Sequence, residues 1–264
     1  MIKVAVCGAL GKMGREVIRA VSEDNVLELV AAIDKIEAGK DIGELVLGKA
    51  CNVSVENDVK TAVQKSKPDV IVDFTQPDFV FENTKLYLEC GVRPVIGTTG
   101  LKPEQIEELK KLSGEKNISC LIAPNFSTGA VLMMRFAKEA AKYFNNAEII
   151  ELHHNQKKDA PSGTAIKTAE LMAEENDNFT TGNCDEKETI TGARGGNGKS
   201  NIHIHSVRMP GYSASQEVIL GAAGQILTIR HDTSDRKCYM PGVLMAIKHV
   251  YNNNSFIYGL DNIM

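Results

Sequence analysis

The first half of the chain repeats a pattern in which a short apolar run is followed by an amphipathic stretch of helical period. Ile2–Cys7 and Leu27–Ile33 are continuous runs of mainly β-branched and small apolar residues. Runs without regular polar alternation are typical of strands buried on both faces of a parallel sheet. Further strands are predicted at residues 53–55, 69–74, 93–96 and 118–122, and helices at residues 15–22, 59–65, 79–89 and 101–112. This order predicts an α/β domain with a doubly wound parallel sheet.

The second half of the chain follows a different pattern. Polar and apolar residues alternate over residues 147–154, 201–209 and 225–231, residues 216–222 are apolar and strand-like, and helices are predicted at residues 128–144 and 164–174. Half-exposed strands predict an α+β second domain with a mostly antiparallel sheet. Residues 176–200 are polar and glycine-bearing, which predicts a long loop. We place the first domain at residues 1–126, with residues 235–264 and a helix at 243–251 returning to it, and the second at residues 127–234.

A glycine turn follows the first predicted strand directly. Gly8, Gly11 and Gly14 have G-x-x-G-x-x-G spacing and open a predicted helix, and Asp34 ends the next strand. Glycines permit a tight turn and close approach of a pyrophosphate, the helix N-terminus supplies N–H groups, and an acid at this place can accept hydrogen bonds from an adenosine ribose. The order of strand, turn, helix, strand and acid predicts a Rossmann-like dinucleotide site, although the commonest spacing is G-x-G-x-x-G. An ordinary tight turn is the alternative.

Lys35, directly after Asp34, bears on the choice of dinucleotide. An acid alone disfavours a ribose 2′-phosphate, whereas an adjacent cation can pair with one, so we expect NADH to bind and NADPH as well. Residues 97–100 and 123–127 each follow a predicted strand. They therefore lie at the carboxyl edge of the sheet, where open α/β folds bind their ligands.

Residues 151–165, with the sequence ELHHNQKKDAPSGTA, concentrate reactive and anion-binding side chains. The Asp-Ala-Pro triplet indicates a loop, and Ser162 or Thr164 would cap the helix that follows it. The first N–H groups of that helix, with Gly163 allowing close approach, are suited to a carboxylate or a phosphate. His153 and Lys157 are both candidate proton donors, and the sequence does not rank them. A surface histidine pair and a simple helix cap are the alternatives.

Composition restricts the partners and the setting of the chain. Its 264 residues have 43% hydrophobic and 24% charged side chains, which is typical of a soluble globular protein. A formal charge of −4 does not favour a nucleic-acid partner, and we expect neither a signal peptide nor a membrane span. The six cysteines show no CxxC spacing, so a reducing cytoplasm is the simplest location, and we expect no metal site.

The segment ELHHNQKKDAPSGTA resembles the signature of the 4-hydroxy-tetrahydrodipicolinate reductase family, also called dihydrodipicolinate reductases. The resemblance extends over essentially the whole chain through VAVCGALGKMGRE, DFTQP, GTTG, APNFSTGA, HSVRMPG and the last PGV helix. It implies reduction by NADH or NADPH of 4-hydroxy-2,3,4,5-tetrahydrodipicolinate to 2,3,4,5-tetrahydrodipicolinate, with loss of water, in the diaminopimelate branch of lysine biosynthesis. It also implies a homotetramer joined through the sheet of the second, substrate-binding domain.

The resemblance also implies roles for matching residues. His153 is the proton donor or acceptor and Lys157 a second donor. The substrate, a small dicarboxylate, is expected to contact His154, Ser162, Gly163, Thr164 and Thr99. The cofactor contacts are expected from Gly8, Ala9, Leu10, Gly11, Lys12, Met13, Asp34, Lys35, Gly97, Thr98, Thr99, Ala123, Pro124, Asn125 and Phe126.

The chain departs from this pattern at one position. Members with a similar segment commonly carry a histidine where Ser215 stands. Two other functions remain open from the residues alone. One is an NAD-dependent dehydrogenase of another small amino or hydroxy acid, and the other is a non-catalytic dinucleotide sensor.

Overall fold

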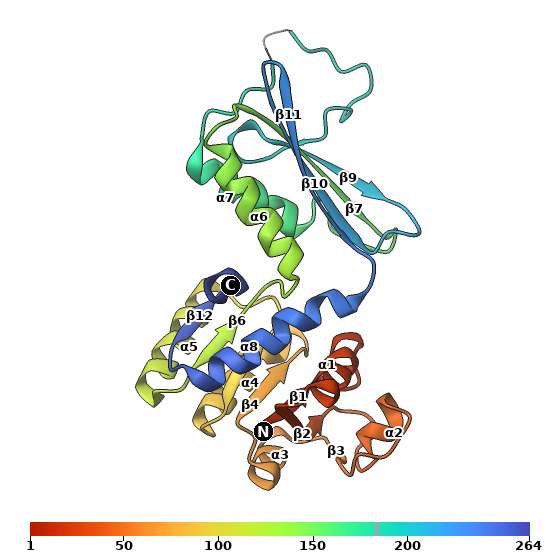
Figure 1. The fold of residues 1–264 in the computed structure, drawn as a ribbon, viewed down its shortest axis with the longest axis vertical. Coiled ribbons are helices and arrows are strands. Elements are labelled where there is room, and N and C mark those ends of the chain that lie inside the picture. Colours follow the sequence, from red (N-terminus) through yellow and green to blue (C-terminus); the bar gives the residue numbers. More distant parts are fainter. Residues whose placement is uncertain (183–184) are drawn as a thin grey trace. The chain divides into compact units, whose positions relative to one another are not determined.

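The structure is a computed structural model that describes residues 1–182 and 185–264 (Figure 1). The chain divides into two compact units. Unit 1 comprises Met1–Thr128 and Arg236–Met264, and unit 2 comprises Gly129–Asp235. Both ends of the chain therefore belong to unit 1, and unit 2 is formed by one continuous segment.

Unit 1 contains a seven-stranded parallel sheet with the strand order β12-β6-β5-β4-β1-β2-β3. Its strands are β1 (Ile2–Cys7), β2 (Leu27–Ile33), β3 (Val55–Glu56), β4 (Val70–Asp73), β5 (Arg93–Ile96), β6 (Cys120–Ile122) and β12 (Phe256–Tyr258). The order β3-β2-β1-β4-β5-β6 is that of a Rossmann sheet, in which the direction of winding reverses between β1 and β4. The predicted parallel, doubly wound sheet is confirmed.

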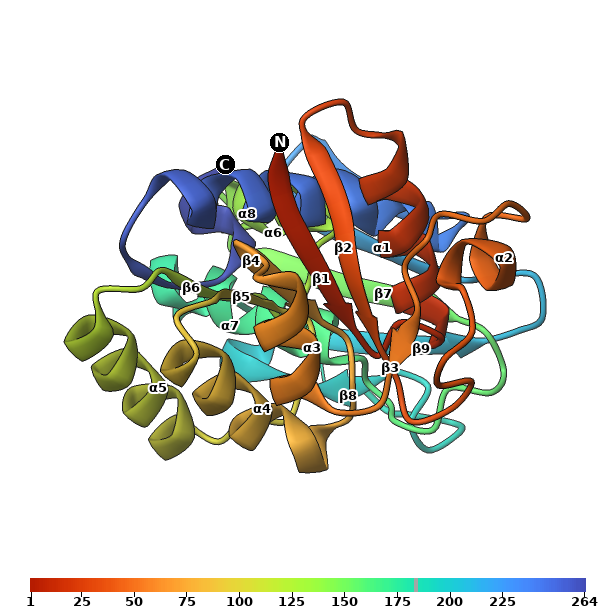
Figure 2. The ribbon, with the colours of Figure 1, turned by 90° about the horizontal axis from the view of Figure 1, so that it is seen from below.

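Helices cover both faces of this sheet (Figure 2). They are α1 (Lys12–Glu23), α2 (Ile42–Val46), α3 (Val59–Ser66), α4 (Pro77–Glu89), α5 (Pro103–Lys116) and α8 (Met240–Asn252), with short 3-10 turns η2 (Arg236–Tyr239) and η3 (Leu260–Ile263). One core layer packs β1, β2 and β4 against α3, α4 and α5, with Ile71, Tyr87, Leu88 and Leu109 fully buried. On the other face α1 and α8 contact each other and the strands.

Unit 2 is an α+β layer structure. Its sheet has the order β11-β10-β7-β9-β8, formed by β7 (Asn146–His153), β8 (Gly196–Asn197), β9 (His203–Arg208), β10 (Ala214–Ala222) and β11 (Gln225–Thr233). Helices α6 (Thr128–Ala141) and α7 (Gly163–Glu175) lie on one face (Figure 1), and η1 is Lys199–Asn201. Ala137, Ile149, Met172 and Val218 are buried between the helices and the sheet. Because helices cover only one face of this sheet, side chains on the other face are exposed, which explains why polar and apolar residues alternate along its strands.

The sheet of unit 2 is mostly antiparallel, as predicted, but one pairing is parallel. β7 and β9 run in the same direction, whereas the pairs β10–β11, β10–β7 and β8–β9 are antiparallel. A parallel neighbour requires a long crossover. Helix α7 and the long loop after it supply that crossover, and Phe179 in this loop is buried in the core.

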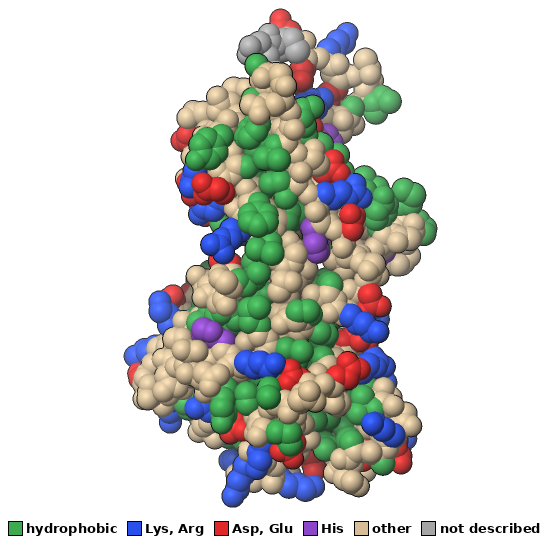
Figure 3. All heavy atoms as spheres, in the orientation of Figure 1, with side chains coloured by type: hydrophobic (Ala, Val, Ile, Leu, Met, Phe, Trp, Pro, Cys, Tyr) green, Lys and Arg blue, Asp and Glu red, His purple; other side chains and the backbone are tan. Residues whose placement is uncertain are grey.

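Within the described ranges, the structure has no helix both long enough and apolar enough for a membrane span. Cys7, Cys51, Cys90, Cys120 and Cys238 are free thiols, and Cys184 lies outside the described residues. On the face drawn in Figure 3, acidic and basic side chains are interspersed.

Candidate active site

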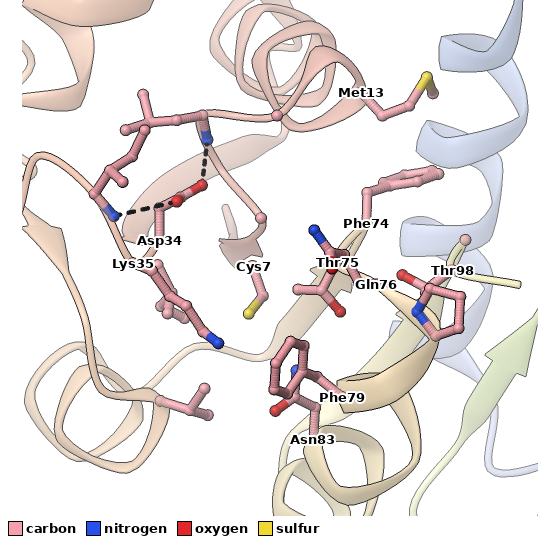
Figure 4. A pocket seen from close by; sticks show the side chains of 18 of the residues that line it. Cys7, Met13, Asp34, Lys35, Phe74, Thr75, Gln76, Phe79, Asn83 and Thr98 are labelled. Carbon is pink, nitrogen blue, oxygen red and sulfur yellow. Dashed lines mark hydrogen bonds between the residues drawn. The ribbon is translucent and has the colours of Figure 1, made fainter. Parts of the chain in front are cut away.

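A cavity of about 1120 Å³ lies in unit 1 at the carboxyl ends of the central strands (Figure 4). Its lining combines the glycine turn after β1, the acid and lysine after β2, and the loops after β4 and β5. Strands β1 and β4 flank the reversal of winding, which is where open α/β sheets bind ligands. The cavity therefore coincides with the place that the topology assigns to a ligand.

Ten of the predicted cofactor contacts line this cavity. They are Gly8, Leu10, Gly11, Lys12, Met13, Asp34, Lys35, Gly97, Thr98 and Thr99. The other five, Ala9, Ala123, Pro124, Asn125 and Phe126, are not part of its lining. Phe126 is buried and its ring packs edge-on against that of Phe74, with 5.8 Å between centroids, so it contacts a lining residue without facing the cavity.

The glycine turn is shaped by contacts that only glycine permits. A Cβ at Gly14 would lie 2.1 Å from the carbonyl oxygen of Gly8, and one at Gly8, whose φ is +76°, would lie 2.5 Å from that of Phe74. Gly11 is the N-cap residue of α1 and provides no side-chain hydrogen bond to it. The first N–H groups of the helix are thus available to an anion in the cavity. This cradle fits the pyrophosphate of a dinucleotide.

Asp34 and Lys35 place opposite charges on one wall of the cavity (Figure 4). Asp34 Oδ2 accepts a hydrogen bond from the Leu10 N–H at 2.8 Å, which joins the end of β2 to the glycine turn. The Lys35 ammonium lies 3.6 Å from the centroid of the Phe79 ring. A cation over an aromatic face is held in place without an anionic partner, so the charge of Lys35 remains available to a ligand.

Asp73, at the end of β4, connects several parts of the cavity wall and is not among the site residues predicted from the sequence. Its carboxylate is fully buried. Oδ1 accepts from Thr75 N at 2.9 Å, Thr75 Oγ1 at 2.7 Å and Thr98 Oγ1 at 2.8 Å. Oδ2 accepts from Tyr87 OH at 2.7 Å and Asn83 Nδ2 at 3.3 Å. The carboxylate of Asp73 therefore holds the loops after β4 and β5 in their positions. An acid at the end of an apolar strand is the sequence signal for it.

Cys7 also lies at this cavity, below the glycine turn (Figure 4). Burial, together with the charge of Asp73, raises the pKa of its thiol to about 12. The thiol is therefore protonated at neutral pH and is a poor nucleophile. Cys7 therefore contributes packing and a weak hydrogen-bonding group to the cavity wall.

The second cluster lies in unit 2, where β7 ends and α7 begins. His153 is the last residue of β7, and its Nδ1 lies 2.6 Å from Glu151 Oε2. Ser162 caps α7 by accepting from Ala165 N at 3.2 Å, so of the two predicted capping residues Ser162 is the observed one. Burial lowers the pKa of His153, and the contact with Glu151 opposes that shift.

The remaining predicted residues of this segment are placed differently. Lys157 donates from Nζ to both carboxylate oxygens of Asp159 at 2.7 Å, so its ammonium is paired with an acid in this structure. His154 is exposed, and its Nδ1 accepts from Gln156 N at 3.2 Å. At Gly163 there is open space where a side chain would be. The first turn of α7 is therefore open to a ligand.

Glu151 also belongs to this cluster, although it is not among the site residues predicted from the sequence. It is fully buried, and its two oxygens accept from Arg208 Nη2 and Nη1 at 2.7 Å each. Its Oε1 also accepts from Ser162 N at 3.1 Å. Burial alone would raise the pKa of Glu151, but the hydrogen bonds from Arg208, Ser206 and His153 lower it to about 2. In the alternating strand at residues 147–154, Glu151 occupies a position where the pattern calls for an apolar residue. A charged residue at such a position is the sequence signal that could have indicated its burial.

The depressed pKa of Glu151 predicts how unit 2 responds to acid. The folded state holds fewer protons on this group than the unfolded state, so its contribution to stability is present above the ordinary pKa of 4.5 and is lost as pH falls toward about 2. In the Glu151→Gln variant this part of the pH dependence should be missing. Urea unfolding of both proteins between about pH 2.5 and 6 measures it. Equal slopes would contradict the assignment.

Together, the sheet order, the glycine cradle and the acid after β2 define a dinucleotide-binding protein of the two-domain α/β class. The described residues contain no group of three or more His, Cys, Asp and Glu side chains arranged to hold a metal ion. The chemistry of this class comes from a bound nicotinamide dinucleotide and from protein groups that move protons.

Comparison with known proteins gives the family. Residues 2–126 match the family model described as dihydrodipicolinate reductase, N-terminus, and residues 129–264 match dihydrodipicolinate reductase, C-terminus. The chain belongs to the dihydrodipicolinate reductase family. The N-terminal match covers the sheet with the glycine cradle, and the C-terminal match includes both unit 2 and the last helix of unit 1.

Individual relatives are similar over their full length. Proteins named 4-hydroxy-tetrahydrodipicolinate reductase from Listeria innocua and from Picosynechococcus sp. are 52% and 51% identical, over 100% of this chain and 100% and 98% of theirs. A dipicolinate-bound dihydrodipicolinate reductase from Paenisporosarcina sp. is 45% identical with a TM-score of 0.89, covering 100% of both chains. An amine dehydrogenase from Mycobacterium smegmatis, 16% identical with a TM-score of 0.71 over 98% of this chain and 95% of that one, shares the fold alone.

Proposed function

We propose that this chain reduces 4-hydroxy-2,3,4,5-tetrahydrodipicolinate to 2,3,4,5-tetrahydrodipicolinate, with loss of water, in the diaminopimelate pathway of lysine biosynthesis. The observation that carries this proposal is the full-length match to reductases of that name by a chain whose residues 151–165 contain His153, Lys157 and the Ser-Gly-Thr sequence at the start of α7. NADH or NADPH, bound in the cavity of unit 1, would supply the hydride.

The proposed acid–base groups are His153 and Lys157. The Nδ1 atom of His153 faces a carboxylate, so Nε2 is the nitrogen that exchanges a proton with the substrate. Lys157 is the second donor. Because its ammonium is paired with Asp159, we propose that the substrate replaces Asp159 as its partner during the reaction.

The substrate carboxylates are proposed to bind at the N-terminus of α7. Its first N–H groups, those of Gly163 and Thr164, lie where the helix dipole favours an anion, and Gly163 leaves room for close approach. Ser162 supports this site through its cap and backbone, and His154 supplies a further hydrogen-bonding group. Thr99, which lines the cavity of unit 1, is proposed to contact both cofactor and substrate.

A coupled assay tests the function directly. Aspartate semialdehyde, pyruvate and the upstream synthase generate the substrate, and loss of NADH and of NADPH is followed separately. Consumption that requires the synthase supports the proposal. Oxidation of other amino or hydroxy acids without it would favour a different dehydrogenase, and tight binding of NADH without turnover would favour a sensor.

The assembly and the location are also proposals. We propose the homotetramer joined through the unit 2 sheet that the family resemblance implies, and the strongly exposed Ile226 on the sheet face opposite α6 and α7 would lie in such an interface. The free thiols agree with a reducing cytoplasm. The expected partners are small molecules, and neither a nucleic acid nor a membrane is among them.

Lys35→Ala should weaken the binding of NADPH more than that of NADH. Only NADPH carries the 2′-phosphate, and loss of one charge-assisted hydrogen bond costs roughly 1.5–3 kcal/mol, or about tenfold or more in Kd. Calorimetric titration of both cofactors measures the difference. Lys40→Ala is the matched control, because Lys40 is an exposed lysine nearby that does not line the cavity. Equal losses for both cofactors with Lys35→Ala would contradict this prediction.

A further inference from the structure

We propose that Glu151 is a positioning residue of the reductase site, because its carboxylate both orients the His153 ring and fixes the start of α7. This inference deepens the proposed function and rests on it. Glu151 has 0% exposure and is enclosed on all sides, so it is not placed to touch a substrate itself. It would act through the groups that it holds.

The first contact determines the tautomer of the imidazole. Glu151 Oε2 lies 2.6 Å from His153 Nδ1. An ionised carboxylate only accepts hydrogen bonds, so the proton of that contact is on Nδ1. In the neutral ring Nε2 is then the basic nitrogen, and in the charged ring it is the nitrogen that donates. The contact also fixes the orientation of the ring, since rotation about its side-chain bonds would break the hydrogen bond.

The second contact connects the same carboxylate to the proposed anion site. Glu151 Oε1 accepts from Ser162 N at 3.1 Å, and Ser162 Oγ caps α7 through Ala165 N. The helix N-terminus and the imidazole are therefore held by the two oxygens of one side chain. A substrate whose carboxylate lies on α7 would meet Nε2 at a set distance and angle, which is the requirement for efficient proton transfer.

Arg208, on β9, keeps Glu151 ionised and in place. Its two terminal nitrogens form a bidentate pair with Glu151 at 2.7 Å each, and Nη2 also donates to the carbonyl oxygen of Asp159 at 2.8 Å. Asp159 is the residue whose carboxylate holds Lys157. The pair thus connects β7 and β9 to the loop that carries the second proposed donor.

Charges around His153 give Glu151 an electrostatic role as well. The charged groups that act on the ring are Glu151 from its own strand, Lys157 from the loop and Arg208 from β9. Without Glu151, a protonated imidazole would face two cations. Removing the carboxylate should therefore lower the pKa of His153 below its already lowered value and shift the alkaline limb of the pH profile toward acid.

The same strand offers a matched control. Glu148, on the opposite face of β7, has an arginine and a histidine as partners, with Arg194 Nη2 at 2.7 Å and His205 Nε2 at 2.6 Å. It has no contact with His153 or with Ser162 among the described residues. Glu148→Gln therefore removes a carboxylate that also pairs with an arginine and a histidine on the same strand, without altering the proposed site.

The test measures both the steady-state kinetics and the tautomer of the His153 ring. The pH dependence of kcat and KM is measured for the wild type, Glu151→Gln and Glu148→Gln, and the ¹⁵N shifts of His153 report its tautomer. Glu151→Gln should lower kcat roughly tenfold to 10²-fold, the size of loss seen when a residue that orients a metal-ligating histidine is removed. It should also move the alkaline limb to lower pH and leave KM for the cofactor unchanged. Glu148→Gln should behave as the wild type.

Folded Glu151→Gln with the kcat and pH profile of the wild type would overturn the proposal. If that variant does not fold, the wild type still decides, because ¹⁵N shifts that place the neutral-ring proton on Nε2 would overturn it as well. A wild type that shows no reductase activity would count against the proposed function. The tautomer measurement needs no substrate, so the two failures are distinguishable.

Discussion

Replacing His153 by alanine should lower kcat by roughly 10²-fold or more, which is the usual effect of removing a general acid. The structure places this imidazole at the end of β7 with Nδ1 on a buried carboxylate, so Nε2 is the nitrogen that can exchange a proton. Dinucleotide binding should be unchanged, because the cavity with the glycine cradle lies wholly in unit 1. Lys157→Ala should lower kcat to a similar extent as the proposed second donor.

Two control variants, each of which removes a residue of the same type elsewhere in unit 2, test whether the effect is specific to His153 and Lys157. His205→Ala removes a histidine of unit 2 that is also paired with a glutamate, and Lys158→Ala removes the exposed lysine next to Lys157. Both should retain kcat within about twofold, the size of effect expected of substitutions away from the chemistry. Steady-state kinetics with both cofactors and calorimetric titration of NADH separate turnover from binding. Normal turnover in both His153→Ala and Lys157→Ala would overturn the assignment of roles.

Asp73→Ala should destabilise unit 1 by about 3 kcal/mol or more. Its carboxylate accepts from two hydroxyls, a backbone N–H, a phenol and an amide, and each buried donor left without a partner costs about 1–3 kcal/mol. Burial, with the charge of Asp73 adding to it, raises the pKa of Tyr87 well above its ordinary value, so the phenol is protonated and donates at neutral pH. It cannot adapt by losing its proton.

The same substitution should also weaken dinucleotide binding. Thr75 and Thr98 line the cavity and are held by Asp73, so their loops would lose their fixed positions. Asp69→Ala is the matched control, since Asp69 lies beside the same strand and makes one exposed hydrogen bond to the Lys3 N–H. It should cost about 1 kcal/mol or less. Urea unfolding and calorimetric titration measure both effects, and equal losses for the two variants would contradict the special role of Asp73.

Most of the first unit could be predicted because its signals are local. Continuous apolar runs located β1 and β2 to the residue, and glycines followed by an acid located the cavity. The predicted ends of helices were less accurate where a helix begins among residues that are uncommon in helices, such as glycine. Helix α1 begins at Lys12 instead of Arg15, within the glycine turn, because a glycine turn can itself enter helical geometry.

Short elements without a pattern were missed. β12 has only three residues, Phe256–Tyr258, too few to show alternation, and it pairs in parallel with β6 from a distant part of the chain. The parallel direction of β9 beside β7 was missed for a related reason. The alternation of polar and apolar residues shows which face of a strand is exposed. Whether the neighbouring strand runs parallel or antiparallel depends on the end of the sheet at which the connecting segment leads back into it.

The sequence by itself determined most of the longer strands and helices, the dinucleotide cradle and the segment with His153 and Lys157, because each depends on residues close together in the chain. Only the tertiary structure decided which side chains hold these groups. Asp73 reaches Thr98, and Glu151 reaches Arg208 57 positions away. A buried carboxylate is tolerated only where donors from other elements converge on it, and that convergence is a property of the packed chain.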